Sequence, residues 1–279
     1  MGRHSRMIDL LARRQVIFGW LANATTVEAA RRAAKDPLMD FVFINMESTG
    51  VYDPAAVRGF MQAMLEAGLQ TNPNTHPIVV RIPTFHGNPE SARRQISELL
   101  NLGIHGIALP EVETADEATQ SLAAMRFAKT ASSSNAPSPA GVRVDDVGES
   151  IHYWGMSEEE YRMRADVYPL NPVGELASLF VVSTEKGRAN CREIARVRPT
   201  LVCAGPGTLD SVSRGAPEQT EASLQTLLAA CKETDVPCGI PANEQDIARR
   251  IKEGFRAIFL HERGYELTIK IGRAAAGRR

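Results

Sequence analysis

The sequence has no apolar run long enough to cross a membrane and no excess of charge of either sign. Its apolar runs are far shorter than the roughly 20 residues that span a bilayer, and charges interrupt the N-terminal segment, so no signal peptide is expected. The formal net charge is −1, and no basic block is concentrated enough for a nucleic-acid surface. These absences argue against membrane and nucleic-acid partners and predict a cytoplasmic protein.

Cysteine is also scarce, and its spacing carries no metal-binding pattern. The four cysteines are Cys191, Cys203, Cys231 and Cys238, and none forms a C-x-x-C pair. Cys203 and Cys238 lie in apolar, strand-like runs, where a free thiol behaves as a small buried side chain. We therefore expect buried free thiols, as is usual in a reducing compartment, rather than a disulfide or a zinc site.

What the sequence does contain is a repeated unit: an amphipathic helix, a glycine near its end, and a short apolar strand. Segment 90–101 has apolar residues at helical spacing, Gly103 follows it as a helix stop, and the run HGIALP is typical of a buried strand. The same order recurs around Gly68 and Gly254. With 279 residues, of which 43% are apolar, the chain can bury a sizeable core between such units.

Eight such units predict an α/β fold, a single (β/α)8 TIM barrel that spans residues 1–279 as one domain. The strands are short and apolar without strict alternation, which is typical of parallel strands covered on both faces. No GxGxxG motif follows the first strand, so a dinucleotide-binding sheet is less favoured. The predicted strands lie near Val16–Leu21, Asp40–Met46, Ile78–Pro83, Gly106–Leu109, Ala177–Val182, Thr200–Ala204, Pro237–Ile240 and Arg256–Leu260.

Residues 130–175, before the fifth barrel strand, interrupt this repeat and are predicted to form an insert. The first part, 130–147, is rich in Ser, Ala and Pro and is expected on the surface. The next part carries an aromatic pair, Tyr153 and Trp154. Exposed aromatic side chains suit a subunit interface or a lid, and we favour the interface.

In a barrel of this type, reactive groups lie on the loops that leave the C-terminal ends of the strands. Arg81 follows the apolar run IVV of the third strand, so its guanidinium is expected at the barrel mouth. There it can hold a carboxylate with two parallel hydrogen bonds. The alternative is a structural ion pair with a glutamate such as Glu47.

After the sixth strand, the turn Gly205, Pro206, Gly207 leads into a helix that starts near Thr208. A helix N-terminus presents free backbone N–H groups, so this turn is a candidate anion site. Together with Arg81, it would bind the carboxylate of a small acid.

The six histidines are the candidates for proton transfer. His86, on the loop after the third strand, has the best position for a general base, although an exposed loop histidine is the commoner outcome. The others are expected at the surface (His4, His76), at a strand start (His105), in the insert (His152) or just after the last strand (His261).

Seven segments between about Phe18 and Leu260 occur in a characteristic order: FGWLAN, FVFINMES, VVRIP, GIHGIALPEVETADEA, NPVGEL, AGPGTLDS and VPCGIPANEQDIARRIKEGFRAIFL. Each segment by itself is only a weak indication of a protein family, whereas the seven in this order are fairly specific. In this order they resemble the HpcH/HpaI aldolase/citrate lyase family, the pyruvate-dependent class II aldolases of the phosphoenolpyruvate/pyruvate-binding barrel superfamily. The resemblance implies a TIM barrel and carbon–carbon lyase chemistry.

In such aldolases a Glu after strand five and an Asp after strand six hold a divalent ion. The ion and the arginine after strand three bind the pyruvate enolate, and a His in an Asp-Gly-Glu-His motif after strand two serves in proton transfer. The resemblance carries over Arg81 and Glu47. Elsewhere a carboxylate or an imidazole is lost: Asn45 and Ser48 in the strand-two motif, Asn88 near the strand-three loop, Ser183 at the metal Glu and Thr208 at the metal Asp.

Because hydroxyl groups are poor substitutes for two carboxylates, we expect no cofactor and no divalent cation. Glu185 and Asp210 each lie two residues beyond a lost ligand, and they would offer a shifted Mg or Mn site. Two residues of strand are about 6–7 Å, however, so such a site would lie well outside the original one.

Two functions stay open. The first is a metal-independent, aldolase-like C–C lyase that acts on a small 2-oxo acid through an enolate held by Arg81, with Glu47 or His86 moving the proton. The second is a catalytically inactive barrel retained for ligand binding or assembly. The resemblance also implies a homo-oligomer, typically a hexamer built from dimers that exchange the last helix, although only about 19 residues follow the last strand here. The predicted substrate contacts are Arg81, Ser48, Ser183, Gly205, Pro206, Gly207 and Thr208.

Overall fold

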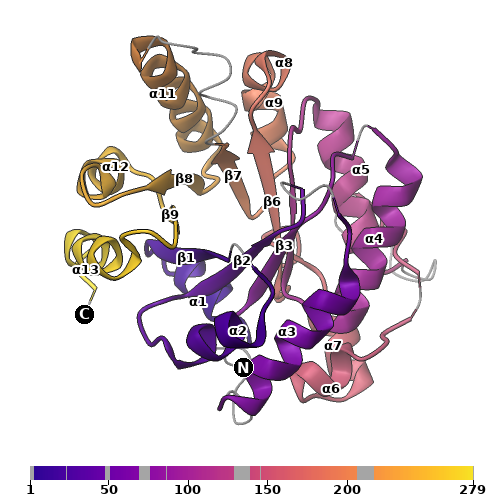
Figure 1. Cartoon of the computed structure of the whole chain (residues 1–279). Coiled ribbons are helices and arrows are strands. Elements are labelled where there is room, and N and C mark those ends of the chain that lie inside the picture. The colour runs from indigo at the N-terminus through magenta and orange to yellow at the C-terminus, as the bar shows by residue number, and fades with distance from the viewer. Residues whose placement is uncertain are drawn as a thin grey trace.

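The computed structural model of the chain describes residues 3–22, 24–47, 51–68, 76–85, 87–128, 139–144, 146–205 and 217–278. Its strands are β1 (Ile17–Ala22), β2 (Phe41–Asn45), β3 (Ile78–Arg81), β4 (Gly106–Leu109), β5 (Val167–Tyr168), β6 (Leu176–Val182), β7 (Leu201–Ala204), β8 (Cys238–Ala242) and β9 (Ala257–Leu260). Eight of them form a closed parallel ring with helices outside it (Figure 1), which confirms the predicted (β/α)8 barrel. Pairing of Gly106 in β4 with Ala177 in β6 closes the ring, and the short β5 pairs with the start of β6 outside it.

Helices connect the strands, and the sequence supplies several of their caps. Helix α4 begins where the Asn88 side chain accepts a hydrogen bond from the Ser91 N–H, and it ends at Gly103 with a left-handed φ of 103°. Gly254 ends α12 in the same way, and Gly68, with a φ of 128°, follows the end of α3, so the three predicted glycine stops are confirmed. The helices are α1 (Arg6–Ala12), α2 (Val27–Lys35), α3 (Pro54–Glu66), α4 (Pro89–Leu102), α5 (Ala115–Met125), α6 (Ser150–Trp154), α7 (Glu158–Arg164), α8 (Glu185–Ala189), α9 (Cys191–Arg196), α11 (Pro217–Thr234), α12 (Ile247–Glu253) and α13 (Tyr265–Ala275).

The inside of the ring is filled by side chains, as in a packed barrel. The rings of Phe41 and Phe43 meet Phe259 edge-on, with centroids 5.6 and 5.3 Å apart. Gly19 of β1 faces this cluster, and a Cβ there would lie 2.1 Å from the Phe41 ring. Glycine at this position therefore makes room for the aromatic filling.

Helix α1 closes the N-terminal end of the barrel. Its residues Met7, Ile8 and Leu11 are buried in the same apolar cluster as the inward-facing Ile17 and Phe41. A pocket inside the ring can therefore open only towards the C-terminal ends of the strands.

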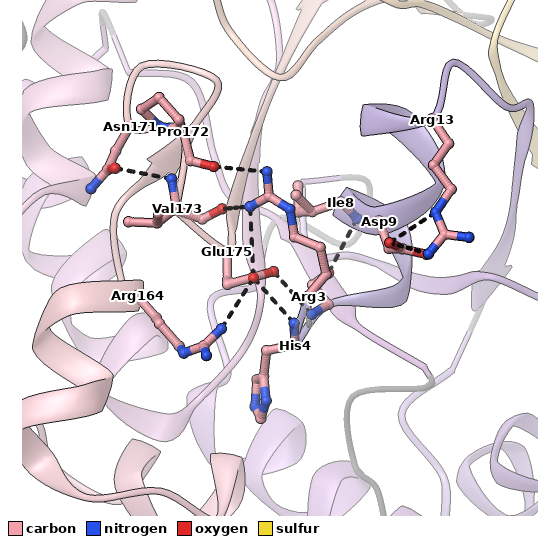
Figure 2. A network of polar contacts seen from close by, with 12 residues as sticks. Arg3, His4, Ile8, Asp9, Arg13, Arg164, Asn171, Pro172, Val173 and Glu175 are labelled. Atoms are coloured by element: carbon pink, nitrogen blue, oxygen red, sulfur yellow. Dashed lines mark hydrogen bonds and ion pairs between the residues drawn. The ribbon is translucent and has the colours of Figure 1, made fainter. Parts of the chain in front are cut away.

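A polar network holds the segment before α1 in place (Figure 2). The Glu175 carboxylate, which is 1% exposed, accepts hydrogen bonds from the backbone N–H groups of His4 and Ser5 at 3.1 and 3.0 Å. Arg164 and Arg3 lie 3.5 and 3.7 Å from the same carboxylate. Burial raises the pKa of Glu175 above its ordinary value, and these donors and cations offset only part of that rise.

The aromatic pair of the insert lies inside the subunit, so the expectation that it forms an interface or a lid is wrong. Trp154 is 1% exposed and stacks on His105 with ring centroids 4.9 Å apart, and its indole N–H donates to the Gly103 carbonyl at 2.7 Å. Tyr153 is 6% exposed. Because His105 directly precedes β4, the pair seals the N-terminal end of the barrel and lies far from its mouth.

The part of the insert that precedes α6 is anchored by a buried arginine. Arg143 is 2% exposed, and its guanidinium donates to the Asn101 side chain at 2.8 Å. The expected surface position of 130–147 is therefore wrong at this residue, while 130–138 and 145 lie outside the described residues.

Two further expectations about buried side chains have opposite outcomes. The four cysteines are free and buried, as predicted. His76, expected at the surface, is 5% exposed, and its Nε2 lies 2.7 Å from the Asp36 carbonyl oxygen.

The last helix, α13, packs on its own barrel. A Cβ at Gly272 would lie 2.7 Å from the Phe18 ring, and Arg273 donates to the Leu38 carbonyl at 2.9 Å. Among the residues that the structure describes, no helix combines the length and apolar character needed to cross a membrane.

Candidate active site

The open, C-terminal end of the barrel holds a pocket of about 730 Å³, a volume that includes its mouth. Small-molecule sites commonly have this size and mostly apolar walls. The polar side chains on its walls are those of Asn45, Arg81 and His261, from the ends of β2, β3 and β9, where the barrel fold places reactive groups. The lining residues are Leu21, Ala22, Phe43, Asn45, Arg81, Val181, Cys203, Ala204, Gly205, Pro241, Phe259 and His261.

Arg81 is the last residue of β3, and its side chain is 15% exposed. Its Nε is buried and has no hydrogen-bond partner among the described residues. A buried donor without an acceptor costs about 1–3 kcal/mol, so this group is suited to a ligand that brings the acceptor. A carboxylate bound by Nε and one Nη would form the two parallel hydrogen bonds that a guanidinium favours.

Glu47 also pairs with this guanidinium, with its Oε2 3.3 Å from Nη2 of Arg81. The structural ion pair that the sequence left open is therefore present, and it occupies one Nη while Nε stays unbonded. Burial lowers the pKa of Arg81, whereas Glu47 and Glu111 raise it. Because an arginine stays protonated across the range of protein pKa shifts, the pocket contains a fixed positive charge.

Glu111, which follows β4, has a left-handed backbone with φ of 54°. Residues other than glycine rarely adopt this conformation, which costs about 1–3 kcal/mol and is found preferentially at functional sites. Since the Glu111 carboxylate acts on the pKa of Arg81, this strained residue belongs to the same polar group at the mouth.

Among the described residues, His261 is the histidine that lines the pocket, and the sequence interpretation missed it. It comes directly after β9 and continues the alternation of Ala257 and Phe259, whose side chains lie inside the ring. That alternation was the available signal, because every second residue of a strand faces the same side. His86, the predicted general base, lies outside the described residues.

Ser183, at the position of a family metal ligand, does not fit a divalent cation. It is fully buried, its hydroxyl has no hydrogen-bond partner among the described residues, and it follows the apolar Val181 and Val182. Mg²⁺ is bound through carboxylate oxygens, which this strand end does not supply. Within the described part of the chain, no group of three or more His, Cys, Asp or Glu side chains could hold a metal ion.

Glu185, the possible substitute ligand, does not face the pocket. It is the exposed first residue of α8, which starts where the Thr184 hydroxyl accepts a hydrogen bond from the Gly187 N–H. Glu185 lines a separate hollow on the outside of the barrel. This position of Glu185 does not favour a shifted metal site, and its proposed partner Asp210 lies outside the described residues.

Cys203 of β7 forms part of the pocket wall, next to Arg81. Burial raises the pKa of its thiol well above the usual range, Cys231 raises it further, and Arg81 lowers it slightly. The thiol is therefore protonated near neutral pH, which argues against nucleophilic catalysis by this cysteine.

Of the predicted site residues, the structure brings Arg81, Glu47 and Gly205 together at the mouth, and Gly205 is the described part of the predicted anion-binding turn. Ser183 is fully buried and does not line the pocket, and His261 joins the group as a new member. The predicted site residues outside the described part of the chain are Ser48, His86, Pro206, Gly207, Thr208 and Asp210.

Comparison with known proteins gives one family. The model of the HpcH/HpaI aldolase/citrate lyase family matches residues 14–254. No curated protein sequence matches the chain.

Three similar solved structures share the fold. An HpcH/HpaI aldolase/citrate lyase family protein from Burkholderia cenocepacia J2315 has a TM-score of 0.72 and 22% identity, covering 94% of each chain. An HpcH/HpaI aldolase from Desulfitobacterium hafniense DCB-2 has a TM-score of 0.70 and 17% identity, covering 91% of this chain and 89% of the other. The citrate synthase SbnG has a TM-score of 0.65 and 17% identity, covering 96% and 93%.

Proposed function

The chain belongs to the HpcH/HpaI aldolase/citrate lyase family, and from this premise we propose that it makes or breaks a carbon–carbon bond of a small 2-oxo acid. The reaction passes through an enolate held by Arg81 and needs no divalent metal. The observation that carries this proposal is the buried Nε of Arg81, which lacks an acceptor among the described residues and lies in a largely apolar pocket.

In the cleavage direction, Arg81 binds the carboxylate of the 2-oxo acid and fixes its orientation. A base removes the proton from the hydroxyl on the carbon that departs, and that carbon leaves as a carbonyl compound. The electron pair of the broken bond moves onto the 2-oxo group, so its oxygen becomes the negatively charged oxygen of an enolate. A fixed cation in an apolar pocket stabilises such a developing charge without reorganisation. Protonation of the enolate carbon then releases the free 2-oxo acid.

Three side chains are candidates for moving these protons: Glu47, His86 and His261. Glu47 lies beside Arg81, and His261 lies on the pocket wall. Both of these candidates are within the described residues. An imidazole can both accept and return a proton in the physiological pH range, whereas the Glu47 carboxylate is already engaged in an ion pair with Arg81. We therefore favour His261 over Glu47 for this step.

The metal-free part of the proposal is supported by the donor set at the end of β6. Ser183 offers a hydroxyl where a cation needs a carboxylate, and Glu185 faces the outside of the barrel. Arg81 then supplies the positive charge that the enolate oxygen requires.

A second function, an inactive barrel that still binds a small acid, is favoured by the Arg81–Glu47 pair. With Oε2 of Glu47 at 3.3 Å, part of the guanidinium is neutralised without any ligand. Such a protein would bind a 2-oxo acid but would not enolise it, so binding and chemistry must be measured separately.

The experiment measures exchange of the methyl protons of pyruvate for deuterium by NMR, with EDTA-treated protein in D2O. Wild type is expected to exchange them, and Arg81→Ala to be slower by about 10²–10³-fold, the usual loss for one transition-state donor. Arg58→Ala, which breaks an exposed ion pair with Glu149 far from the pocket, is the control and should not change the rate.

Thermal unfolding with pyruvate or oxaloacetate supplies the binding measurement. Stabilisation without exchange would establish the second function. If neither acid stabilises the protein at millimolar concentration, the 2-oxo-acid pocket is wrong. If exchange disappears with EDTA and returns only with Mg²⁺ or Mn²⁺, the metal-free mechanism is wrong.

A further inference from the structure

A second pocket, of about 660 Å³ including its open side, lies at the N-terminal end of the barrel. It is built from segments that precede the strands: the end of α1, the loops that enter β7, β8 and β9, and Tyr168 of β5. Three guanidinium groups, of Arg14, Arg198 and Arg256, line it together with the carboxylate of Asp235. These four side chains have a net formal charge of +2.

The single carboxylate on this wall is already occupied. Arg14 holds Asp235 with two hydrogen bonds of 3.0 and 2.6 Å. Within the described part of the chain, the side chains of Arg198 and Arg256 form neither a hydrogen bond nor an ion pair. Arg256 is half-buried, and its pKa is lowered first by burial and then by Arg14, while Asp235 offsets part of this decrease. The excess positive charge is therefore concentrated on Arg198 and Arg256.

Capping of helix ends does not explain these arginines. Basic side chains near a helix C-terminus commonly donate to its last carbonyl groups, and Lys232 does this at the end of α12, where its Nζ donates to the Glu253 carbonyl at 2.7 Å. No such bond to a described residue is formed by the Arg198 or Arg256 side chain. Arg198 is exposed and Arg256 half-buried, so both guanidinium groups can be reached by a ligand in this pocket.

Charged residues around this pocket also adopt a backbone conformation that usually favours glycine. Arg14, Arg198 and Asp235 each follow the end of a helix with a left-handed φ, of 58°, 58° and 54°. Glycine is preferred at such positions, and this chain uses it there in α4 and α12, at Gly103 and Gly254. Around the positive pocket, charged residues occupy this conformation although glycine would adopt it with less strain.

We propose that this N-terminal pocket binds the phosphoryl group of a small molecule, either inorganic phosphate or a phosphate monoester. A guanidinium matches a phosphate oxygen pair with two hydrogen bonds, and a dianion balances the net charge of +2. A monocarboxylate would neutralise only one of the two unpaired guanidiniums. The site lies at the opposite end of the barrel from Arg81, so it does not depend on the proposed 2-oxo-acid chemistry.

The test titrates inorganic phosphate into the full-length protein at constant ionic strength, with isothermal calorimetry and thermal unfolding as readouts. Saturable binding is expected, with a rise in Tm of about 3 °C at ten times Kd. Arg256→Gln and Arg198→Gln should each weaken phosphate binding at least 10-fold. Arg192→Gln is the matched control: its arginine forms an exposed pair with Glu233 outside the pocket and should leave the affinity unchanged.

A sugar phosphate is titrated in parallel to identify the source of the phosphoryl group. Binding at least 10-fold tighter than that of phosphate would show that a phosphate monoester uses the rest of the pocket, and equal binding would identify free phosphate. Absence of saturable phosphate binding up to 20 mM, or equal phosphate affinity in wild type and Arg256→Gln (its far-UV circular dichroism unchanged), would overturn the proposal.

Discussion

The two ends of the barrel differ in how many partners they provide for a buried charged side chain. At the N-terminal end, the Glu175 carboxylate is surrounded by two backbone donors and two arginines, all from its own chain (Figure 2). At the C-terminal end, Arg81 has one partner, Glu47, and a buried Nε with no described acceptor. A buried polar group that is fully satisfied stabilises one structure, whereas one that lacks a partner has a reason to bind a ligand.

The apolar contacts follow the same division. Helix α1 and the stacked Trp154 and His105 seal the N-terminal end, while the C-terminal end stays open above Phe259. In this fold the C-terminal face ordinarily carries catalysis and the N-terminal face stability. The positive pocket beside Arg256 is the exception at the N-terminal end, because two of its three guanidinium groups, those of Arg198 and Arg256, have no hydrogen bond or ion pair with a described residue.

The largest effect is expected from a substitution that removes packing at the N-terminal end of the barrel. Trp154→Ala removes a fully buried side chain and its hydrogen bond to Gly103, and it should lower the free energy of unfolding by about 3–5 kcal/mol. Urea unfolding measures this loss. Tyr153→Phe is the control, because the Tyr153 hydroxyl is buried without a partner among the described residues and its removal should cost little. Pyruvate binding by folded Trp154→Ala should match wild type, and a large change would contradict the separation of the two ends.

A change at the C-terminal end should do the reverse. His261→Asn is expected to slow deuterium exchange into pyruvate about 100-fold, the usual contribution of a proton-transfer group. Since His261 is exposed on the pocket wall, the free energy of unfolding should stay within about 0.5 kcal/mol of wild type. An unchanged exchange rate would show that His261 does not move the proton and would leave His86 or Glu47 for this step.

Acid should weaken the N-terminal end through its buried histidines. Burial lowers the pKa of His4 to about 4 and that of His105 to about 3. Both stay neutral in the folded protein, whereas the unfolded chain takes up protons below about pH 6.5. The unfolded state therefore binds more protons as the pH falls, and the free energy of unfolding should drop by on the order of 1 kcal/mol per histidine and pH unit.

Urea unfolding at pH 7 and pH 5 measures this slope. His105→Asn should make it shallower, and the exposed His152→Asn should leave it unchanged. Equal slopes in wild type and His105→Asn would mean that His105 is not kept neutral by burial.

The smallest expected effect concerns the ion pair at the mouth. Glu47→Gln frees the Nη2 of Arg81 from a charged competitor, and it should tighten pyruvate binding by about 2–5-fold, as expected for a weak and partly exposed pair. A calorimetric titration measures this change. Weaker binding in the variant would show instead that Glu47 positions Arg81 for the substrate.

Much of the barrel could be predicted because its signals are local. A glycine such as Gly103 ends a helix through its own backbone freedom, and a short apolar run between turn residues is typical of a strand covered on both faces. Arg81 was predictable for the same reason, since a single charge after an apolar run marks a strand end. Its unbonded Nε could not be predicted, because that depends on every atom around the guanidinium.

The sequence by itself determined the order of helices and strands and the arginine after the third barrel strand, because these depend on neighbours along the chain, and the number of repeated units indicated the closed ring. Only the tertiary structure decided that His261 faces the pocket, that Trp154 seals the opposite end, and that Arg198 and Arg256 meet without partners in the described chain. Those contacts join residues far apart in the sequence. Their burial and charge balance exist only after the ring has closed and the loops at its two ends have been brought together.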